Sequence, residues 1–272
     1  RMCGSWWQKR KPRKLISNKQ IIRTLSSKNM DQLNKTRLYF LPGTMCDETL
    51  WHRLWPLLQE DFELVHLAIP QEASLVDMAR ALNTELGKIH CVQPINLVGF
   101  SLGGYLAALY TSLYPASVER LLVMANSPCA LPESELKPRR QIIAWLQHSI
   151  YKGATDARIQ LLLGSKSQSD LALIRHIQQM ERNLGLEQLL PQLSASSVRE
   201  DLTSFFARTQ IPTRFIYGKQ DVLVDSSWFS GFTNPNVRAK DLGDYGHMLP
   251  LEAPELVGQQ IRRHFNISQQ FP

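Results

Sequence analysis

A serine flanked by glycines is the first feature of this sequence that indicates chemistry. In the run LVGFSLGG, Ser101 lies two residues after Gly99 and two residues before Gly103. Glycine tolerates backbone angles and close chain approaches that a side chain forbids. The G-x-S-x-G pattern is typical of a nucleophile elbow, a sharp strand-to-helix turn that leaves the serine hydroxyl exposed. Because a pattern this short also arises by chance, it needs support from the rest of the chain.

A serine hydroxyl is a weak nucleophile unless other side chains activate it. An imidazole must accept its proton, and a carboxylate must fix the tautomer of that imidazole. Asp221 in IYGKQDVLV and His247 in DLGDYGHMLPLE each follow a predicted strand, and the order Ser, Asp, His is the one expected with a nucleophile elbow. Asp225 is a rival for the carboxylate role. The sequence therefore predicts nucleophilic catalysis by Ser101 with His247 and Asp221.

These side chains require parallel strands whose carboxyl ends meet at one edge of a sheet. Strands that alternate with helices and are nearly all apolar are typical of a parallel, doubly wound α/β sheet covered on both faces. Ligands bind beyond the carboxyl ends of such strands. The sequence predicts helices over residues 74–87, 102–114 and 254–265, and strands over residues 36–41, 62–69, 95–100, 118–125, 213–218 and 237–242.

One long segment interrupts this alternation. Between Pro132 and about Arg208 no strand pattern occurs, and helical patterns appear over residues 139–150 and 170–185. A connection of this length is too long for an ordinary loop. We therefore expect a helical cap over about residues 132–208, inserted after the fourth strand and lying over one end of the sheet.

The positive charge of the chain is concentrated in its first residues. The net charge is +7, but residues 1–29 hold nine basic side chains and no acidic one. We interpret residues 1–29 as a disordered basic extension and residues 30–272 as the α/β domain. Two alternatives for the extension are an arm that binds polyanions or a membrane surface and an organelle transit peptide. Because the rest of the chain is close to neutral, we expect no nucleic-acid partner.

Composition excludes several other classes of protein. The basic extension has no continuous apolar stretch long enough for the core of a secretory signal, and no segment approaches the roughly 20 apolar residues of a membrane span. The four cysteines show no paired spacing, so we expect a reducing, cytoplasmic location without disulfides. Without clustered Cys and His we expect no metal, and the sequence leaves the oligomeric state open.

From about Arg37 to the C-terminus, the chain resembles the α/β-hydrolase superfamily. It is most similar to the small capped serine hydrolases that include carboxylesterases of the biotin-pathway type. One departure from the family pattern is Pro42-Gly43, where many relatives carry His-Gly. The motifs that carry the resemblance are LPGTMCDETLW (41–51), GFSLGG (99–104), ANSPCALPE (125–133), GKQD (218–221) and GHMLPLEAPE (246–255).

The resemblance implies a cofactor-free reaction on a carboxylic ester or thioester, through an acyl-enzyme intermediate. It also implies an oxyanion hole made by the backbone N–H groups of Thr44 and Leu102, and a small acyl substrate that includes the carrier-linked kind. Met45 and Met248 adjoin these positions, and we expect them to line an apolar acyl pocket. The basic run Lys137, Arg139 and Arg140 could steer an anionic substrate or an acyl carrier, although such runs are more often solvated.

Two other functions stay open from the sequence alone. Relatives of this fold use the same triad for carbon–carbon cleavage or for elimination, as in the menaquinone-pathway synthase. A ligand-binding receptor built on a hydrolase scaffold is an alternative from another class. A serine at the elbow argues against dehalogenases and epoxide hydrolases, which carry an aspartate there.

Overall fold

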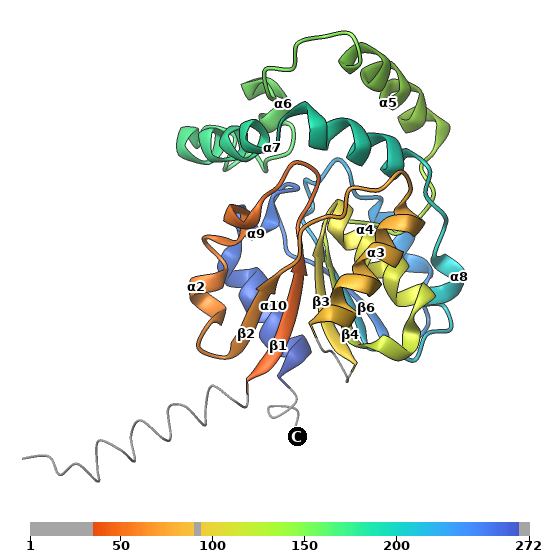
Figure 1. Ribbon diagram of the computed structural model, residues 1–272. Helices are drawn as coiled ribbons and strands as arrows, with labels where there is room; N and C mark the ends of the chain where they lie inside the picture. Colours follow the sequence, from red (N-terminus) through yellow and green to blue (C-terminus); the bar gives the residue numbers. More distant parts are fainter. Residues whose placement is uncertain (1–34, 90–93, 267–272) are drawn as a thin grey trace, which may run out of the picture. The chain divides into compact units, whose positions relative to one another are not determined.

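A six-stranded sheet forms the centre of the protein. The structure is a computed structural model that describes residues 35–89 and 94–266. The strands lie in the order β2-β1-β3-β4-β5-β6, seen partly edge-on in Figure 1. Their bounds are β1 (Thr36–Leu41), β2 (Phe62–His66), β3 (Ile95–Phe100), β4 (Val118–Met124), β5 (Thr213–Tyr217) and β6 (Val237–Asp241).

Every neighbouring pair of strands in this sheet is parallel. The registers align the carboxyl ends, because Leu41 lies beside Gly99, Phe100 beside Met124, and Met124 beside Ile216. The predicted fold class is therefore confirmed. As the sequence analysis expected, the loops that follow β1, β3, β5 and β6 begin at one edge of the sheet.

Helices cover both faces of the sheet and bury two apolar cores. One core lies between the sheet and α3 (Leu75–Lys88) and α4 (Leu102–Leu113). The other lies between the sheet and α2 (Trp55–Leu58), α9 (Leu249–Glu252) and α10 (Pro254–Phe265). Each fully buried Leu, Val or Phe side chain contributes about 1.5–3 kcal/mol relative to an exposed one. These two cores hold the strand ends, and the loops that follow them, in place.

Several predicted element bounds differ from the structure. The second strand ends at His66 rather than residue 69, one residue before Leu67, whose N–H donates the last hydrogen bond to β1, at the Phe40 carbonyl oxygen. The helix predicted over residues 139–150 is α5 (Glu133–Leu146), which begins before Pro138 and accommodates that proline inside the helix. The helix predicted over residues 170–185 is the first part of α7 (Leu171–Ser197); Gly185 has non-helical angles (φ 67°, ψ −175°), and a second helical part follows this kink.

The segment between β4 and β5 contains helices and no strand. In addition to α5 and α7 it holds α6 (Asp156–Gln160) and α8 (Thr203–Phe206). Figure 1 shows α5, α6 and α7 lying across the end of the sheet at which the strands terminate. We retain the assignment of residues 132–208 as a helical cap as a proposal. Residues 1–29 lie outside the described residues, and their interpretation as an extension stays a prediction.

Two glycines allow the strand-to-helix turn after β3 to fit against the loop after β1. A Cβ atom added at Gly103 would overlap the carbonyl oxygen of Pro42, and one added at Gly99 would overlap the carbonyl oxygen of Gly103. By contrast, nothing lies within 4 Å of a Cβ added at Gly87 near the end of α3. Backbone atoms cannot move aside as the end of a flexible side chain can.

The substitution Gly103→Ala is therefore expected to lower the free energy of unfolding by about 1–3 kcal/mol, the usual effect of overpacking. The matched substitution Gly87→Ala is expected to raise it by about 0.5–1 kcal/mol, because alanine loses less backbone entropy in a helix. Urea denaturation of both variants measures these changes. An unchanged free energy of unfolding for Gly103→Ala would contradict this account of the turn.

Candidate active site

Ser101 occupies a strained turn between β3 and α4. Its backbone has φ 52° and ψ −118°, which non-glycine residues rarely adopt. Such a conformation costs about 1–3 kcal/mol and persists only where the surroundings enforce it. Here the Ser101 N–H donates to the carbonyl oxygen of Met124 at 2.9 Å, which ties the turn to the end of β4. The turn presents the Ser101 side chain at the edge of the sheet.

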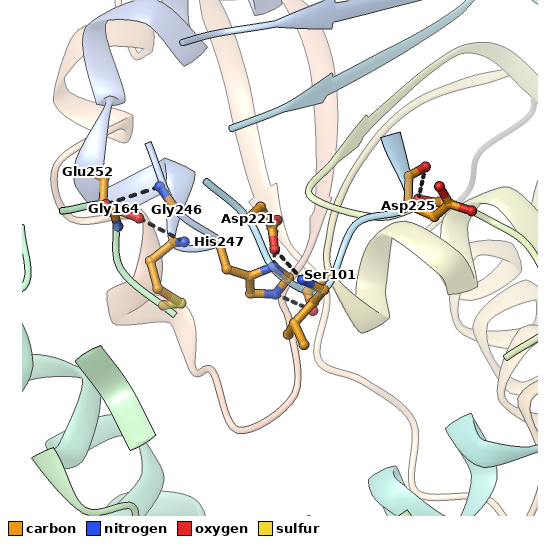
Figure 2. Close-up of polar contacts among 10 residues, drawn as sticks. Ser101, Gly164, Asp221, Asp225, Gly246, His247 and Glu252 are labelled. Atoms are coloured by element: carbon orange, nitrogen blue, oxygen red, sulfur yellow. Dashed lines mark hydrogen bonds and ion pairs between the residues drawn. The ribbon is translucent and has the colours of Figure 1, made fainter. Parts of the chain in front are cut away.

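His247 and Asp221 come from the loops after β6 and β5 and meet Ser101 at this edge. His247 Nε2 lies 2.8 Å from Ser101 Oγ, and His247 Nδ1 lies 2.8 Å from Asp221 Oδ2. Figure 2 shows the imidazole of His247 between the Ser101 hydroxyl and the Asp221 carboxylate. The Asp221 side chain is fully buried, and that of His247 is 6% exposed. The structure thus brings together the three predicted side chains.

This arrangement determines the roles of the two imidazole nitrogens. An ionised carboxylate only accepts hydrogen bonds, so Nδ1 carries a proton and donates it to Asp221. Nε2 is then free to accept the hydroxyl proton of Ser101. Asp221 itself is held by the Leu223 N–H, which donates to its other oxygen, Oδ1, at 2.9 Å. The geometry matches a serine that is activated by a general base.

The loop after β1 lies directly against the Ser101 turn. A Cβ atom added at Gly43 would meet the Phe100 ring and, at 3.0 Å, the Cβ of Ser101. The Cys46 N–H closes a turn by donating to the Gly43 carbonyl oxygen. Thr44 lies inside this turn, and its own N–H takes no part in the hydrogen bond that closes it. Leu102 is the first residue of α4, where backbone N–H groups have no partner within the helix. Both N–H groups predicted for the oxyanion hole therefore belong to segments that border Ser101.

The two methionines predicted for an acyl pocket lie in different surroundings. Met45 is buried in a small apolar cluster with Leu146 of α5 and Leu189 of α7. Met248 is buried in the core on the α10 side of the sheet. Met45 therefore packs with α5 and the second part of α7, whereas Met248 belongs to the larger core, which also includes Ile177 and Met180 from the first part of α7. Their assignment to a substrate pocket stays a prediction.

Sequence reasoning did not single out Glu252, whose carboxylate holds the His247 loop. Its oxygens accept the backbone N–H groups of Gly164 at 2.7 Å, Gly246 at 3.3 Å and Met248 at 3.1 Å. Burial raises the pKa of this carboxyl group, and the three N–H donors oppose that rise. Figure 2 shows Glu252 next to Gly164 and Gly246. A glutamate inside the apolar run MLPLEAP is the signal that could have indicated it.

The substitution Glu252→Ala is expected to lower the free energy of unfolding by about 2–4 kcal/mol, because it leaves buried N–H groups without an acceptor. Glu255→Ala is the matched control, since Glu255 is exposed in the first turn of α10. Its effect is expected to stay below about 1 kcal/mol, the size of a helix-dipole interaction. Urea denaturation of the two variants measures the difference, and equal losses would show that Glu252 does not hold the loop.

The remaining candidate groups lie apart from this site or are unsuited to it. Asp225 caps a short 3-10 helix, η3 (Ser226–Gly231), by accepting the Ser227 N–H. Burial raises the pKa of the Cys46 and Cys129 thiols, which disfavours the reactive thiolate. Arg139 and Arg140 form ion pairs with Glu135 and Glu133 of the same helix. The structure thus favours Asp221 over Asp225 beside the imidazole and gives two of the three basic side chains local partners.

The described part of the chain holds neither a metal-binding cluster nor a membrane-spanning helix. Within residues 35–89 and 94–266, no group of three or more His, Cys, Asp or Glu side chains is arranged to hold a metal ion. Over the same residues, no helix combines the length and the apolarity needed to cross a membrane.

Comparison with known proteins links the chain to one fold family and to several enzymes. The family model described as alpha/beta hydrolase fold matches residues 41–254. The human monoacylglycerol lipase ABHD6 is 23% identical over 259 residues, which cover 84% of this chain and 74% of the relative. The pimeloyl-[acyl-carrier protein] methyl ester esterase of Wigglesworthia glossinidia brevipalpis is 23% identical over 200 residues, covering 69% of this chain and 75% of that esterase.

Solved structures agree on the fold. A thermophilic esterase from Thermogutta terrifontis, with malate bound, superposes with a TM-score of 0.74 at 20% identity, covering 84% of this chain and 88% of the esterase. MenH from S. aureus superposes with a TM-score of 0.68 at 18% identity, covering 85% of this chain and 93% of MenH. At these identities the likeness concerns the arrangement of the strands and helices.

Proposed function

The chain belongs to the α/β-hydrolase fold family and is a carboxylesterase-like hydrolase, and from this premise we propose that it cleaves carboxylic esters through an acyl-enzyme intermediate on Ser101. The observation that carries the proposal is the continuous hydrogen-bonded series from Ser101 Oγ through the His247 ring to Asp221. A hydroxyl, an imidazole and a buried carboxylate in this order form the arrangement that activates serine toward an acyl carbon.

In the first half-reaction, Ser101 Oγ attacks the acyl carbon of the ester while His247 Nε2 takes the hydroxyl proton. The carbonyl oxygen becomes an oxyanion in the tetrahedral intermediate. We assign the Thr44 and Leu102 N–H groups as its donors, since each such donor contributes about 3–4 kcal/mol to the stability of the transition state. The protonated imidazole, stabilised by Asp221, then donates its proton to the leaving alcohol as the C–O bond breaks.

In the second half-reaction, water replaces the alcohol. His247 Nε2 removes a proton from the water as the water oxygen attacks the acyl carbon on Ser101. A second tetrahedral oxyanion forms against the same donors. Its collapse breaks the bond to Ser101 Oγ, which takes the proton from His247, and the carboxylic acid leaves. No cofactor takes part in either step.

The names of the relatives support esters as the substrate class. One relative is a monoacylglycerol lipase, and another acts on the methyl ester of an acyl chain attached to a carrier protein. We propose a small acyl ester as the substrate of this chain, with carrier-linked acyl chains included in that class. Leu146 of α5 and Leu189 of α7, which pack against Met45, suit an apolar acyl group.

A partition experiment tests the acyl-enzyme directly. Butyrate esters of p-nitrophenol, phenol and glycerol are hydrolysed in the presence of methanol, and butyric acid and methyl butyrate are quantified. If all three pass through one butyryl-enzyme, the ratio of the two products is expected to be the same for each leaving group. A ratio that changes with the leaving group contradicts the intermediate. Failure to cleave these esters, with turnover only of carbon–carbon or thioester substrates, would overturn the proposed ester specificity.

A further inference from the structure

The side chain of Gln192 contacts the loop that borders Ser101, although it lies far from that loop in the sequence. It is 5% exposed, and it projects from α7 among leucines. Its Oε1 accepts the backbone N–H of Met45 at 2.9 Å. A buried amide is unfavourable unless its polar atoms are hydrogen bonded. This contact therefore gives a physical reason for an amide at an otherwise apolar position.

Met45 is the residue of this loop that most needs external support. Its φ of 57° lies in the left-handed region, which favours glycine. The bond from Cys46 N–H to the Gly43 carbonyl oxygen closes the turn around it, and its side chain lies against Leu146 and Leu189. A residue held in such a conformation persists only where its surroundings over-determine it. The helices above the sheet supply that support, through Gln192 and the leucines.

The position of the Met45 N–H is linked to that of the Thr44 N–H. The peptide group is planar, so the hydrogen bond to Gln192 fixes the plane between Thr44 and Met45. The Thr44 N–H belongs to the preceding peptide group. Only the φ and ψ torsions of Thr44 separate it from the Thr44–Met45 plane. The turn closed by the Cys46 N–H and the Gly43 carbonyl oxygen limits how far these two torsions can compensate. A rotation of the Thr44–Met45 plane is therefore expected to change the direction of the Thr44 N–H.

We propose that Gln192 is a positioning residue that holds the Gly43–Cys46 turn so that the Thr44 N–H points at the oxyanion. This inference rests on the proposed function, because it concerns the donors of that reaction. It makes α7 a part of the oxyanion hole's support as well as a cover over the site.

Asn183 of α7 provides a matched control. Its Nδ2 donates to Asp47 Oδ2 at 3.1 Å, just beyond the turn, and the pair is exposed. Asn183 precedes the kink at Gly185 and Gln192 follows it. Asn183→Ala therefore removes a hydrogen bond between α7 and the same loop without removing an acceptor from the turn. Its kcat is expected to stay within about threefold of the unsubstituted protein, as for most surface changes away from reacting groups.

Gln192→Leu removes the acceptor and puts an apolar side chain of similar volume in its place. Loss of a whole oxyanion donor lowers kcat about 10²- to 10³-fold, and a loosened donor is expected to lose about 10- to 100-fold of kcat with KM changed little. Gln192→Glu keeps an oxygen that can accept from Met45 and is expected to recover most of that loss. Thermal unfolding of each variant establishes that it is folded at the assay temperature.

A thionoester substrate distinguishes an oxyanion defect from a general loss of structure. Sulfur accepts hydrogen bonds weakly, so an intact oxyanion hole favours the oxygen ester over the thionoester. Gln192→Leu is expected to lower the ratio of kcat for the oxygen ester to kcat for the thionoester by about tenfold, which is within the effect of one donor. A partly unfolded enzyme would instead lose activity toward both substrates equally, so the ratio would not change. An unchanged preference, or an unchanged kcat in Gln192→Leu, would overturn the inference.

The outcomes also separate this inference from the proposed function. If Ser101→Ala keeps its activity, the proposed function fails, whatever Gln192 does. If Ser101→Ala is inactive and Gln192→Leu retains both its kcat and its preference for the oxygen ester, only the positioning role fails.

Discussion

Replacing Ser101 with alanine is expected to lower kcat for p-nitrophenyl butyrate about 10⁴- to 10⁶-fold, because no other group can form the acyl intermediate. The residual rate would come from binding and the oxyanion donors alone. Steady-state hydrolysis measures the change, with circular dichroism to establish that the variant is folded. The substitution is not expected to relieve the backbone strain at residue 101, where φ is 52°, because alanine has the same backbone restriction as serine.

Ser112→Ala is the matched control for this experiment. Ser112 lies on the same helix, α4, and its hydroxyl donates to the Leu109 carbonyl oxygen rather than to the imidazole. Its kcat is expected to stay within about twofold of the unsubstituted protein, in line with surface substitutions elsewhere. Retention of more than about 1% of kcat by Ser101→Ala would contradict a nucleophilic role, given the size of such losses in serine hydrolases.

Replacing Asp221 with asparagine is expected to lower kcat about 10⁴-fold, the effect of placing the imidazole in the wrong tautomer. The asparagine amide can donate to His247 Nδ1, which then lacks its proton. Nε2 carries that proton instead and can no longer accept one from Ser101. The enzyme would bind ester but would fail to activate the hydroxyl. Steady-state kinetics with p-nitrophenyl butyrate test this expectation: kcat should fall while KM stays nearly unchanged.

The same substitution at Asp225 is the control that the sequence itself suggests. Asp225 lies four residues later and caps η3 instead of meeting the imidazole. Asp225→Asn keeps a side chain that can cap a helix, and its kcat is expected to remain within about threefold, as for changes away from reacting groups. A larger loss from Asp225→Asn than from Asp221→Asn would reverse the assignment of the carboxylate.

The fold and the meeting of the three polar side chains could be predicted because both follow from local patterns. Apolar runs ending at Pro, Gly or Asp define strands, and parallel strands bring their carboxyl ends to one edge. Ser101 and Asp221 each follow such a run within a few residues, and His247 follows the more polar strand pattern VRAKDL. Their meeting therefore required only the order of the elements and no knowledge of side-chain packing.

Gln192 and Glu252 could not be identified in this way, because their roles depend on contacts between distant segments. The Gln192 side chain reaches a loop 147 residues earlier. Glu252 lies close to His247 in sequence, but its carboxylate also joins Gly164 from the segment above the sheet. Hydrophobic periodicity reports which face of a helix is buried, but it does not report which backbone group a buried polar atom meets.

The bounds of α5 were wrong for a related reason. Proline usually ends or kinks a helix, so a helix that runs through Pro138 is not expected from the sequence. In the structure, α5 contains Pro138, whereas Gly185 has non-helical backbone angles that divide α7 at the predicted end of its first part. The continuation after Gly185 is the part of α7 that carries Gln192.

Covalent labelling tests the central claim most directly. The protein is incubated with a fluorophosphonate, which transfers its phosphonyl group to an activated serine with loss of fluoride, and the modified peptide is sequenced by mass spectrometry. We expect one adduct per chain, located on Ser101, and labelling that slows greatly in His247→Gln. An adduct on another residue, or no adduct while the protein still hydrolyses esters, would contradict the account.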